Sequence, residues 1–531
     1  MYFAGNRGCF PVAPKPPRDN VGGGDRMEHP FLYEINTRCW LRGLSDAAGR
    51  AITLADVPDR EFVFWKNSGF THLWLMGVWT TGPICRAMAI AEPNLRRAYD
   101  EIIPGWRDAD IGGSPYAIGD YTVPAAIGGE AGLKKFRERL HAHGLKLILD
   151  FVPNHLGLDH RWLRERPNLF VQSVVEMPGT FAQETVLGPR WLAHGKDPYF
   201  APWNDTVQVD YRRAAARAAM QEQLLAVAAQ CDGVRCDMAM LLLNEVFAKT
   251  WEHLPLGVPP SGGSGAEPPE GGTPNEFWAD AIPAVKARQP DFIFLAEVYW
   301  DLESRMQELG FDFTYDKRLY DELFWHNAAG AHRRVVDSPR ELLARSAHFI
   351  ENHDEPRIAG QLSPVEQRAA ALVILGLPGM RFLHEGQLTG ARVKLPVQLA
   401  RRGSETPNVE LSKIYNDLLT ALQHSAVGRG KWRALVPRAA WPDNPTATNF
   451  VIVQWQTSGP AFDLVVVNLA PHRSQCYATL EVENLAEHNW EMRDLLGPER
   501  FERFGADLAS QGLYLDLPEH GAQLFHFEPV R

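Results

Sequence analysis

The chain has 531 residues, of which 45% are hydrophobic and 22% are charged. Because a single hydrophobic core stops growing at about 250–300 residues, this composition predicts a globular protein of two or three domains. The formal net charge of -11 disfavours nucleic acid or an anionic membrane surface as a partner.

The N-terminal segment is rich in Pro and Gly, and it has no basic stretch followed by an apolar stretch. The sequence has no apolar run of about 18 residues either. Six cysteines lie far apart except for Cys231 and Cys236, which we interpret as inert core thiols rather than a redox pair. We therefore expect a reduced, cytoplasmic protein, with residues 1–29 as an N-terminal arm.

Short apolar segments alternate with helical patterns along most of the chain. The predicted strands cover residues 33–40, 71–79, 145–155, 233–240, 291–300, 311–316, 348–354 and 380–387. Most are apolar on both faces, as buried parallel strands are. Amphipathic helices are predicted at 130–144, 211–230 and 412–425. This order predicts an α/β fold, a (β/α)8 TIM barrel.

The alternation breaks in three places. The barrel is expected in residues 30–155 and 209–426, with an inserted domain at 156–208 after the third strand. Residues 255–274 have low complexity and are predicted to form a flexible loop. Residues 427–531 contain short alternating strands, which predict a C-terminal antiparallel β domain.

Polar side chains follow four of the predicted strands. They are Asp150, Asn154 and His155 after the third, Arg235 and Asp237 after the fourth, Glu297 after the fifth, and His353 and Asp354 after the seventh. Because a barrel of this type builds its active site at the carboxyl ends of its strands, we expect these side chains to converge on one pocket.

Four short motifs around these residues resemble those of a known family. "DFVPNH", "GVRCDMAM", "FLAEVYW" and "FIENHDEP" are similar, in order and in position, to the motifs of the α-amylase family of glycoside hydrolases (family thirteen). Supporting matches are "YEINTRCWL" on the first strand, "GSPYAIGDY" before the third and "LPGMRFLHEGQ" on the eighth. The resemblance runs from about residue 33 to the end of the chain.

The resemblance implies a role for each of these side chains. Asp237 would be the nucleophile, Glu297 the general acid and Asp354 a third carboxylate that binds sugar hydroxyls. Arg235 would keep Asp237 ionised, since a neighbouring cation favours the charged form of a carboxylate. Burial and the other carboxylates would raise the pKa of Glu297. The resemblance also implies that His155 and His353 bind hydroxyls and that Tyr116 stacks on the sugar.

Other positions admit simpler interpretations. We expect Asp150 to be structural and to orient Arg235, and Glu351 to lie at the surface or behind the site. The resemblance implies a calcium-ligand role for Asn154, as in the calcium-dependent members of the family; the alternative is that Asn154 only caps a turn. We therefore expect no required cofactor and keep Ca²⁺ as an alternative. The alternative to hydroxyl binding by His155 is that it is a hydrogen-bonded histidine of the core.

Two departures from the family pattern bear on specificity. Met240 and Leu241 stand where many starch hydrolases have a basic pair that grips the leaving sugars, so the acceptor side is expected to be less polar. The loop after the eighth strand carries Arg392, Lys394, Arg401 and Arg402. This loop is either a solvated basic segment or a site for an anionic group such as a sugar phosphate.

Three functions follow from these features. The first is a retaining α-glycosidase acting on α-1,4-linked glucans or maltooligosaccharides. The second is an α-glucan transglycosylase with the same catalytic residues, because only the acceptor site distinguishes the two. The third is an inactive carbohydrate-binding protein, which the intact Asp237, Glu297 and Asp354 disfavour. The expected partner is an α-glucan or oligosaccharide; the sequence predicts no oligomeric state.

Overall fold

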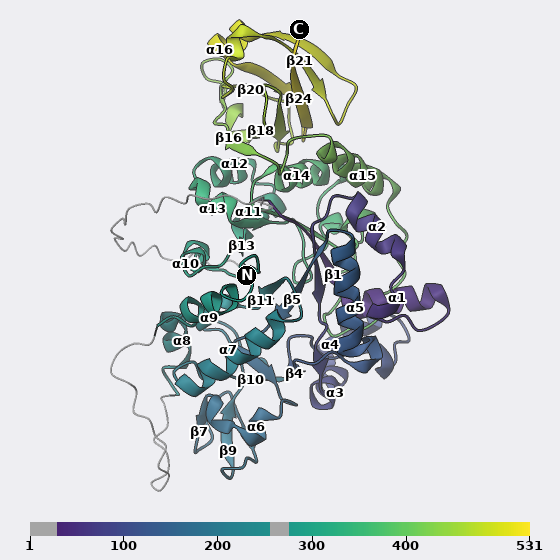
Figure 1. The fold of residues 1–531 in the computed structure, drawn as a ribbon, viewed down its shortest axis with the longest axis vertical. Coiled ribbons are helices and arrows are strands. Elements are labelled where there is room, and N and C mark those ends of the chain that lie inside the picture. The colour runs from purple at the N-terminus through teal and green to yellow at the C-terminus, as the bar shows by residue number, and fades with distance from the viewer. Residues whose placement is uncertain (1–28, 255–274, 531) are drawn as a thin grey trace.

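The computed structural model describes residues 29–254 and 275–530. Parallel strands close into a barrel in the centre of the molecule (Figure 1). In their order around the barrel they are β1 (Phe31–Asn36), β2 (His72–Met76), β5 (Lys146–Phe151), β11 (Gly233–Cys236), β12 (Ile293–Ala296), β13 (Phe313–Tyr315), β14 (Ser346–His348) and β15 (Met380–His384). The predicted (β/α)8 barrel is confirmed.

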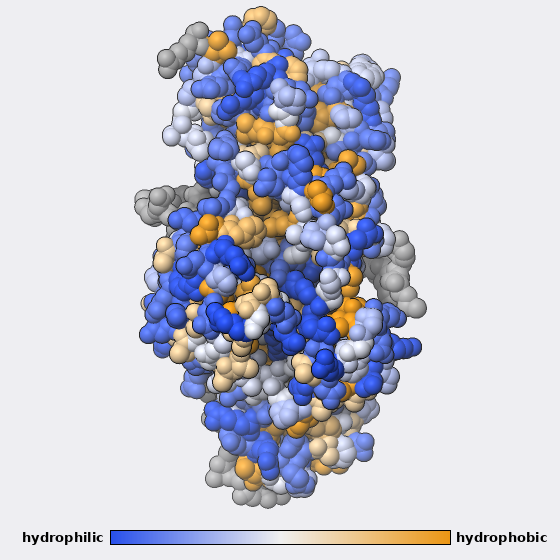
Figure 2. Space-filling model, turned by 90° about the vertical axis from the view of Figure 1, so that its right-hand side faces the viewer, coloured by the Kyte–Doolittle hydropathy of each residue, from blue (hydrophilic) through white to orange (hydrophobic). Residues whose placement is uncertain are grey.

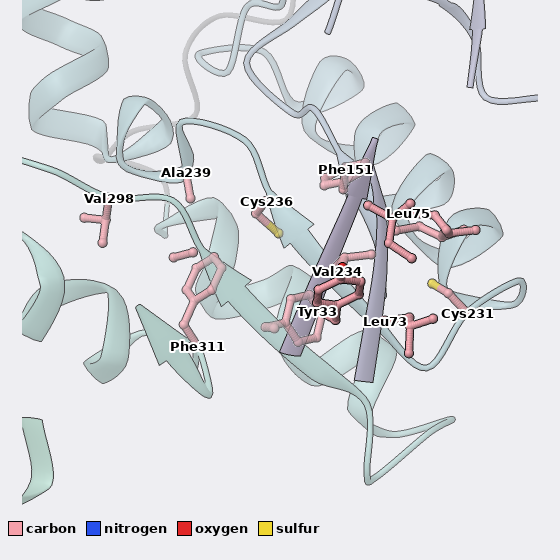
Figure 3. Packing of buried hydrophobic residues seen from close by; sticks show 14 of the residues in the cluster. Tyr33, Leu73, Leu75, Phe151, Cys231, Val234, Cys236, Ala239, Val298 and Phe311 are labelled. Atoms are coloured by element: carbon pink, nitrogen blue, oxygen red, sulfur yellow. The ribbon is translucent and has the colours of Figure 1, made fainter. Parts of the chain in front are cut away.

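The strands alternate between an inner and an outer face, as a period of two requires. On β2, Trp74 and Met76 belong to the cluster inside the barrel, whereas Leu73 and Leu75 pack outward with the helices. Figure 3 shows this outer layer, in which Cys236 lies near Val234. Cys231 and Cys236 are both buried and free, which confirms their interpretation as core thiols.

Two predicted strands were placed too late in the chain. The strand predicted at 33–40 is β1 at Phe31–Asn36, and helix α1 (Thr37–Ala48) begins inside the predicted range. The second is the strand predicted at 348–354. Strand β14 covers Ser346–His348, whereas residues 348–354 were expected to be extended. The Asn352 Oδ1 atom accepts hydrogen bonds from the backbone N–H groups of Asp354 (2.9 Å) and Glu355 (3.0 Å). This side-chain turn replaces the strand ladder, so His353 and Asp354 lie on a loop at the barrel mouth.

Helices surround the barrel (Figure 1). They are α1 (Thr37–Ala48), α2 (Asp59–Asn67), α5 (Gly129–Ala142), α7 (Ala214–Ala228), α8 (Asn244–Trp251), α9 (Phe277–Lys286), α10 (Glu303–Glu308), α11 (Lys317–Phe324), α12 (Ala328–Val336), α13 (Arg340–Ala344), α14 (Pro364–Gly376) and α15 (Val409–Gln423). Helix α14 has a clear start signal, because the N-cap residue Ser363 forms a capping box with Glu366 and Pro364 is the first helical residue.

Two excursions extend from the carboxyl ends of the strands. After β2 come β3 (Thr80–Thr81), α3 (Pro83–Ala91), α4 (Pro93–Ile102) and β4 (Ile118–Asp120). After β5 come β6 (His155–Gly157), α6 (Trp162–Glu165), β7 (Gln172–Ser173), β8 (Thr180–Gln183), β9 (Arg190–Ala193) and β10 (Thr206–Gln208). The latter form a two-stranded sheet and a three-stranded sheet at one end of the molecule (Figure 1).

The C-terminal part is antiparallel β structure, as predicted. One sheet contains β16 (Lys431–Ala434), β18 (Phe450–Gln456), β19 (Phe462–Asn468), β24 (Ala522–Val530), β21 (Asn489–Asp494) and β22 (Arg500–Phe504). The other contains β17 (Arg438–Ala439), β20 (Ser474–Ala478) and β23 (Leu513–Leu517), and α16 (Gly505–Gln511) follows β22. Apolar residues of both sheets form a separate core.

Figure 2 shows that hydrophilic residues cover most of the face that it displays, with small hydrophobic patches between them. In residues 29–254 and 275–530, none of the helices is long and apolar enough to cross a membrane. The predicted N-terminal arm, apart from His29, and the predicted loop at 255–274 lie outside the described residues.

Candidate active site

Arg235 on β11 is the centre of the candidate site. Its side chain is fully buried, and its guanidinium contacts three carboxylates from three loops. The Nη1 atom lies 2.6 Å from Asp237 Oδ1, and the Nη2 atom lies 2.9 Å from Glu297 Oε2 and 3.8 Å from Asp354 Oδ2. The structure therefore brings together the three acidic residues that the sequence singled out.

Aromatic rings hold this guanidinium in place. Its central carbon lies 5.2 Å from the ring centroids of both Trp74 and Tyr116, and 5.8 Å from that of Tyr315. Arg235 Nε also donates to the Tyr315 hydroxyl at 3.3 Å. Cation–π contacts strengthen when water is excluded, so a cation that would be costly to bury alone is fixed between rings and carboxylates.

Glu297 follows β12 and is buried. Its Oε2 atom accepts a hydrogen bond from the Met238 backbone N–H at 2.6 Å, and its Oε1 atom accepts one from the Tyr299 hydroxyl at 2.9 Å. Met238 has a φ of 41°, a conformation that costs a non-glycine residue free energy and turns its N–H toward Glu297. The strained residue thus lies directly beside Asp237.

Burial raises the pKa of Glu297 to about 7; Arg235 opposes this shift, while Asp237 and Asp354 add to it. The direction is the one expected from the sequence. Burial also raises the pKa of Asp237, against the ion pair with Arg235. Arg235 therefore acts in the expected sense on Asp237, but desolvation outweighs it, which the sequence analysis did not foresee.

His353 lies between Asp354 and Glu34, a residue of β1, and contacts both. Its Nδ1 atom lies 2.5 Å from Glu34 Oε1, and its Nε2 atom lies 2.9 Å from Asp354 Oδ2 and 2.6 Å from the Tyr116 hydroxyl. Burial would lower the pKa of His353, but Asp354 and Glu34 together raise it to about 10. The pKa of Asp354 is lowered despite burial, chiefly by His353 and then by Arg235, so Asp354 stays charged.

Sequence reasoning missed two members of this network. Glu34 is a fully buried carboxylate within β1, and Tyr299 follows Glu297 by two residues on the same side of the chain. Glu34 could have been found because it is a charged residue inside an otherwise apolar strand, and a buried charge requires a partner. The signal for Tyr299 was its spacing: in the strand predicted at 291–300, residues two positions apart lie on the same face, and Tyr299 is two positions after Glu297.

His155 lies on β6, at the start of the segment that follows β5. Its ring centroid is 5.0 Å from that of Trp203. Burial lowers the pKa of His155 to about 4, against Asp205 and a backbone hydrogen bond with Tyr116. A neutral histidine beside Tyr116 suits hydroxyl binding and equally suits a core position, so both interpretations stay predictions.

Asp150 is structural, but in a different way from the one expected. Its carboxylate accepts hydrogen bonds from Trp74 Nε1 (3.0 Å) and the Gly77 N–H (2.8 Å), rather than from the Arg235 guanidinium. Asp150 pairs with Arg235 in the strand register. It therefore fixes Trp74, and Trp74 in turn covers the guanidinium.

The Asn154 side chain pairs with that of Gln208. Its side-chain oxygen accepts from Gln208 Nε2 at 3.0 Å, and its Nδ2 atom donates to Gln208 Oε1 at 3.2 Å. Calcium in proteins requires several carboxylate or carbonyl oxygens. The described residues contain no group of three or more His, Cys, Asp or Glu side chains that could hold a metal ion. We assign no step of the chemistry to a metal.

Glu351 is not at the surface. It is fully buried, and Arg357 Nη1 donates to its Oε1 atom at 2.7 Å. The surface alternative was therefore wrong, because the charge is compensated inside the protein. Met240 and Leu241 are also buried in the core, so neither residue supplies a polar contact on the acceptor side.

The basic loop after β15 is largely engaged in ion pairs. Arg401 Nε lies 2.9 Å from Asp110 Oδ1, and Arg402 Nη2 lies 2.8 Å from Glu385 Oε2. The Lys394 ammonium group donates to the backbone carbonyl of Asp354. The loop therefore lies against the site, and it is not simply a solvated segment.

The chain is similar to a protein family and to several known proteins. The family described as "Alpha amylase, catalytic domain" matches residues 107–417. "Alpha-amylase MalA" of Haloarcula japonica is 24% identical over 285 residues, 52% of this chain and 36% of the relative. "Alpha-amylase 3" of Dictyoglomus thermophilum is 20% identical over 398 residues, 70% of this chain and 66% of the relative. The chain thus spans about one to two thirds of the length of these curated relatives.

A solved structure shows the same fold. The maltogenic α-amylase AmyB from Thermotoga neapolitana superposes with a TM-score of 0.62 at 17% identity. The match covers 95% of this chain and 99% of that chain.

Proposed function

Since the chain belongs to the α-amylase family of glycoside hydrolases, we propose that it is a retaining α-glycosidase acting on α-1,4-linked glucans or maltooligosaccharides. The observation that carries this proposal is the contact of one guanidinium, that of Arg235, with both Asp237 and Glu297. Retention requires a nucleophilic carboxylate and an acid close together on opposite sides of the scissile bond. Neighbouring strands β11 and β12 supply these two groups.

In the first step, neutral Glu297 protonates the glycosidic oxygen while Asp237 attacks the anomeric carbon. The C–O bond to the leaving sugar breaks, and an ester bond to Asp237 forms. The proton on Glu297 belongs on Oε1, because Oε2 contacts the Arg235 guanidinium. Its pKa of about 7 leaves much of Glu297 protonated at neutral pH.

In the second step, Glu297 acts as a base. Once Asp237 is esterified it carries no negative charge, so the repulsion that helped to raise the pKa of Glu297 disappears. The ionised Glu297 then takes a proton from water, whose oxygen attacks the anomeric carbon and releases Asp237. The same residue is thus tuned as an acid before esterification and as a base after it.

Asp354, His353 and Tyr116 are proposed to hold the donor sugar. The charged Asp354 accepts hydrogen bonds from sugar hydroxyls and favours positive charge in the transition state. The protonated His353 donates from Nε2 to Asp354 and from Nδ1 to Glu34, and so holds the charged Asp354 toward the sugar. The Tyr116 ring, which stacks at 5.4 Å on that of His353, is proposed to supply an apolar contact for the sugar.

One observation favours transglycosylation as a second candidate. Trp300 follows Tyr299, has a φ of 65° and is 38% exposed, and its ring centroid is 5.0 Å from that of Tyr199 in the inserted segment. An aromatic surface next to Glu297 would bind a sugar acceptor and compete with water. The identity of the acceptor then decides between hydrolysis and transfer.

Proton NMR during incubation with maltooligosaccharides tests the proposal. We expect the first new reducing end to be the α anomer, with shorter products from hydrolysis and additional longer ones from transfer. The Asp237→Asn variant is the control and should form neither. A β anomer at the earliest time points would contradict retention. Turnover of other glycosides alone would contradict the substrate class.

A further inference from the structure

A donor-rich recess borders the candidate site at His353. It is lined by residues at the ends of β1 and β15 and in the loops that follow β14 and β15. The polar groups that bear on its chemistry are Asn352, His384, Lys394 and Arg402. His353 lines the recess and also contacts Asp354, so the recess and the candidate site share this side chain.

The position of the recess identifies which end of the substrate it faces. Strands β1, β15 and β14 are consecutive in the barrel, and β12 lies beyond β13. Glu297 at the end of β12 protonates the leaving group, so the leaving sugar lies on that side. The recess therefore faces the part of the glycosyl donor that points away from the bond being broken.

Asn352 is only 1% exposed, yet its Nδ2 atom has no hydrogen-bond partner. Exchanging the oxygen and nitrogen of this amide would break two hydrogen bonds, since the oxygen accepts from two backbone N–H groups. A buried donor without a partner costs free energy. A ligand that supplies an acceptor at this point would recover that cost.

Two cationic side chains, Lys394 and Arg402, also line the recess beside the Asn352 amide. The Lys394 ammonium group donates to a backbone carbonyl rather than to a carboxylate. Arg402 is anchored by Glu385 at 2.8 Å and lines the same recess. The one acidic side chain that lines it, Glu355, is paired with Lys317 at 3.3 Å. The wall therefore presents donors and positive charge, which match the oxygens of an anion.

We propose that this recess binds an oxyanion, a phosphate monoester or a carboxylate, carried by the glycosyl donor. This inference rests on the proposed function and extends its substrate class from neutral maltooligosaccharides to anionic α-glucosides. The shared chemistry of both groups is a set of negatively charged oxygens that accept from Asn352 and Lys394.

Calorimetric titration of the Glu297→Gln variant tests the recess without turnover. The probes are glucose, glucose 6-phosphate, glucuronate and inorganic phosphate. We expect glucose 6-phosphate or glucuronate to bind about tenfold more tightly than glucose, the gain of one charge-assisted hydrogen bond. The preferred probe distinguishes a phosphate from a carboxylate. Binding of inorganic phosphate alone, or equal binding of all sugars, would overturn the proposal.

Variants identify the groups responsible. Lys394→Gln and Asn352→Asp, each combined with Glu297→Gln, should abolish the preference for the anionic sugar. Asn352→Asp keeps the oxygen that caps the turn and replaces the donor by a negative charge. Lys134→Gln is the control, since Lys134 is exposed on α5. A preference that survives in both test variants would place the anion elsewhere and refute the proposal.

Turnover separates this inference from the proposed function. Wild-type protein should hydrolyse 4-nitrophenyl α-glucoside 6-phosphate or the α-glucuronide with a higher kcat/KM than the unmodified glucoside. If the anionic sugars bind selectively but none of these glycosides is cleaved, the proposed function fails and the recess stands. If only the neutral glucoside is cleaved and bound, the recess assignment fails and the proposed function stands.

Discussion

Three carboxylates lie within 4 Å of one guanidinium, and their surroundings give them different protonation states. Glu297 has a pKa of about 7 because burial and two negative neighbours outweigh Arg235. Asp354 has a lowered pKa because the charged His353 contacts it directly. Groups whose pKa values are driven apart in this way are suited to separate acid and anion roles.

Activity should fall as pH rises through about 7, since the protonated form of Glu297 is the acid. The Tyr299 hydroxyl donates to Glu297 Oε1 and thereby stabilises the carboxylate. Tyr299→Phe removes that hydrogen bond, raises the pKa of Glu297, and should move the alkaline limb of the kcat/KM profile upward by about one pH unit. A limb that stays in place or moves down would contradict this role.

Glu297→Gln should reduce kcat on maltooligosaccharides by about 10²- to 10⁴-fold, the usual contribution of a positioned acid. A donor with a good leaving group, such as an α-glucosyl fluoride, needs no proton and should retain most of its glycosylation rate. The comparison of single-turnover rates on both donors checks this. Equal losses on the two would show that Glu297 does not act as the acid.

At the scale of elements, the barrel was predictable because buried parallel strands leave continuous apolar runs. Polar residues directly after those runs identified Asp237 and Glu297. Glu34 and Tyr299 were missed because their roles depend on partners far apart in sequence or on side-chain orientation: Glu34 contacts His353 across 319 positions. The displacement of β14 has a local cause, the turn made by Asn352, which an apolar pattern does not reveal.

The contact between α14 and β19 gives a test at this scale. A Cβ atom added at Gly376 would lie 2.7 Å from Val465 Cγ1. Gly376→Ala should therefore destabilise the protein by about 1–3 kcal/mol through overpacking. Gly43→Ala in α1 is the matched control; its Cβ atom meets nothing within 4 Å, so helix propensity should stabilise it by about 0.5–1 kcal/mol. Thermal unfolding measures both, and a Tm for Gly376→Ala at or above that of wild type would refute the contact.

At the scale of the molecule, the C-terminal sheet shares a core with the barrel. Val451, Val453 and Trp455 of β18 belong to the same apolar cluster as the helices around the barrel. Trp455 Nε1 donates to the Gly376 carbonyl at 2.8 Å, and His332 Nδ1 lies 2.7 Å from the Phe450 carbonyl. The antiparallel pattern was readable from the sequence, but this shared packing was not, since it depends on which face of the sheet meets α14.

Removal of residues 431–531 should leave a barrel that aggregates, because it exposes the apolar surface that β18 and β19 cover. Size-exclusion chromatography of the shortened and complete chains checks this. A shortened chain that is monodisperse and keeps the wild-type Tm would show that the two parts are independent.

The central claim is that Asp237 attacks the sugar while Glu297, held by the same guanidinium, supplies the proton. Trapping with a 5-fluoro-α-glucosyl fluoride, followed by peptide mass spectrometry, tests this most directly. The account predicts one fluoroglucosyl group on Asp237, and none on Asp237→Asn. Labelling of Glu297, Asp354 or another residue in an active preparation would contradict it.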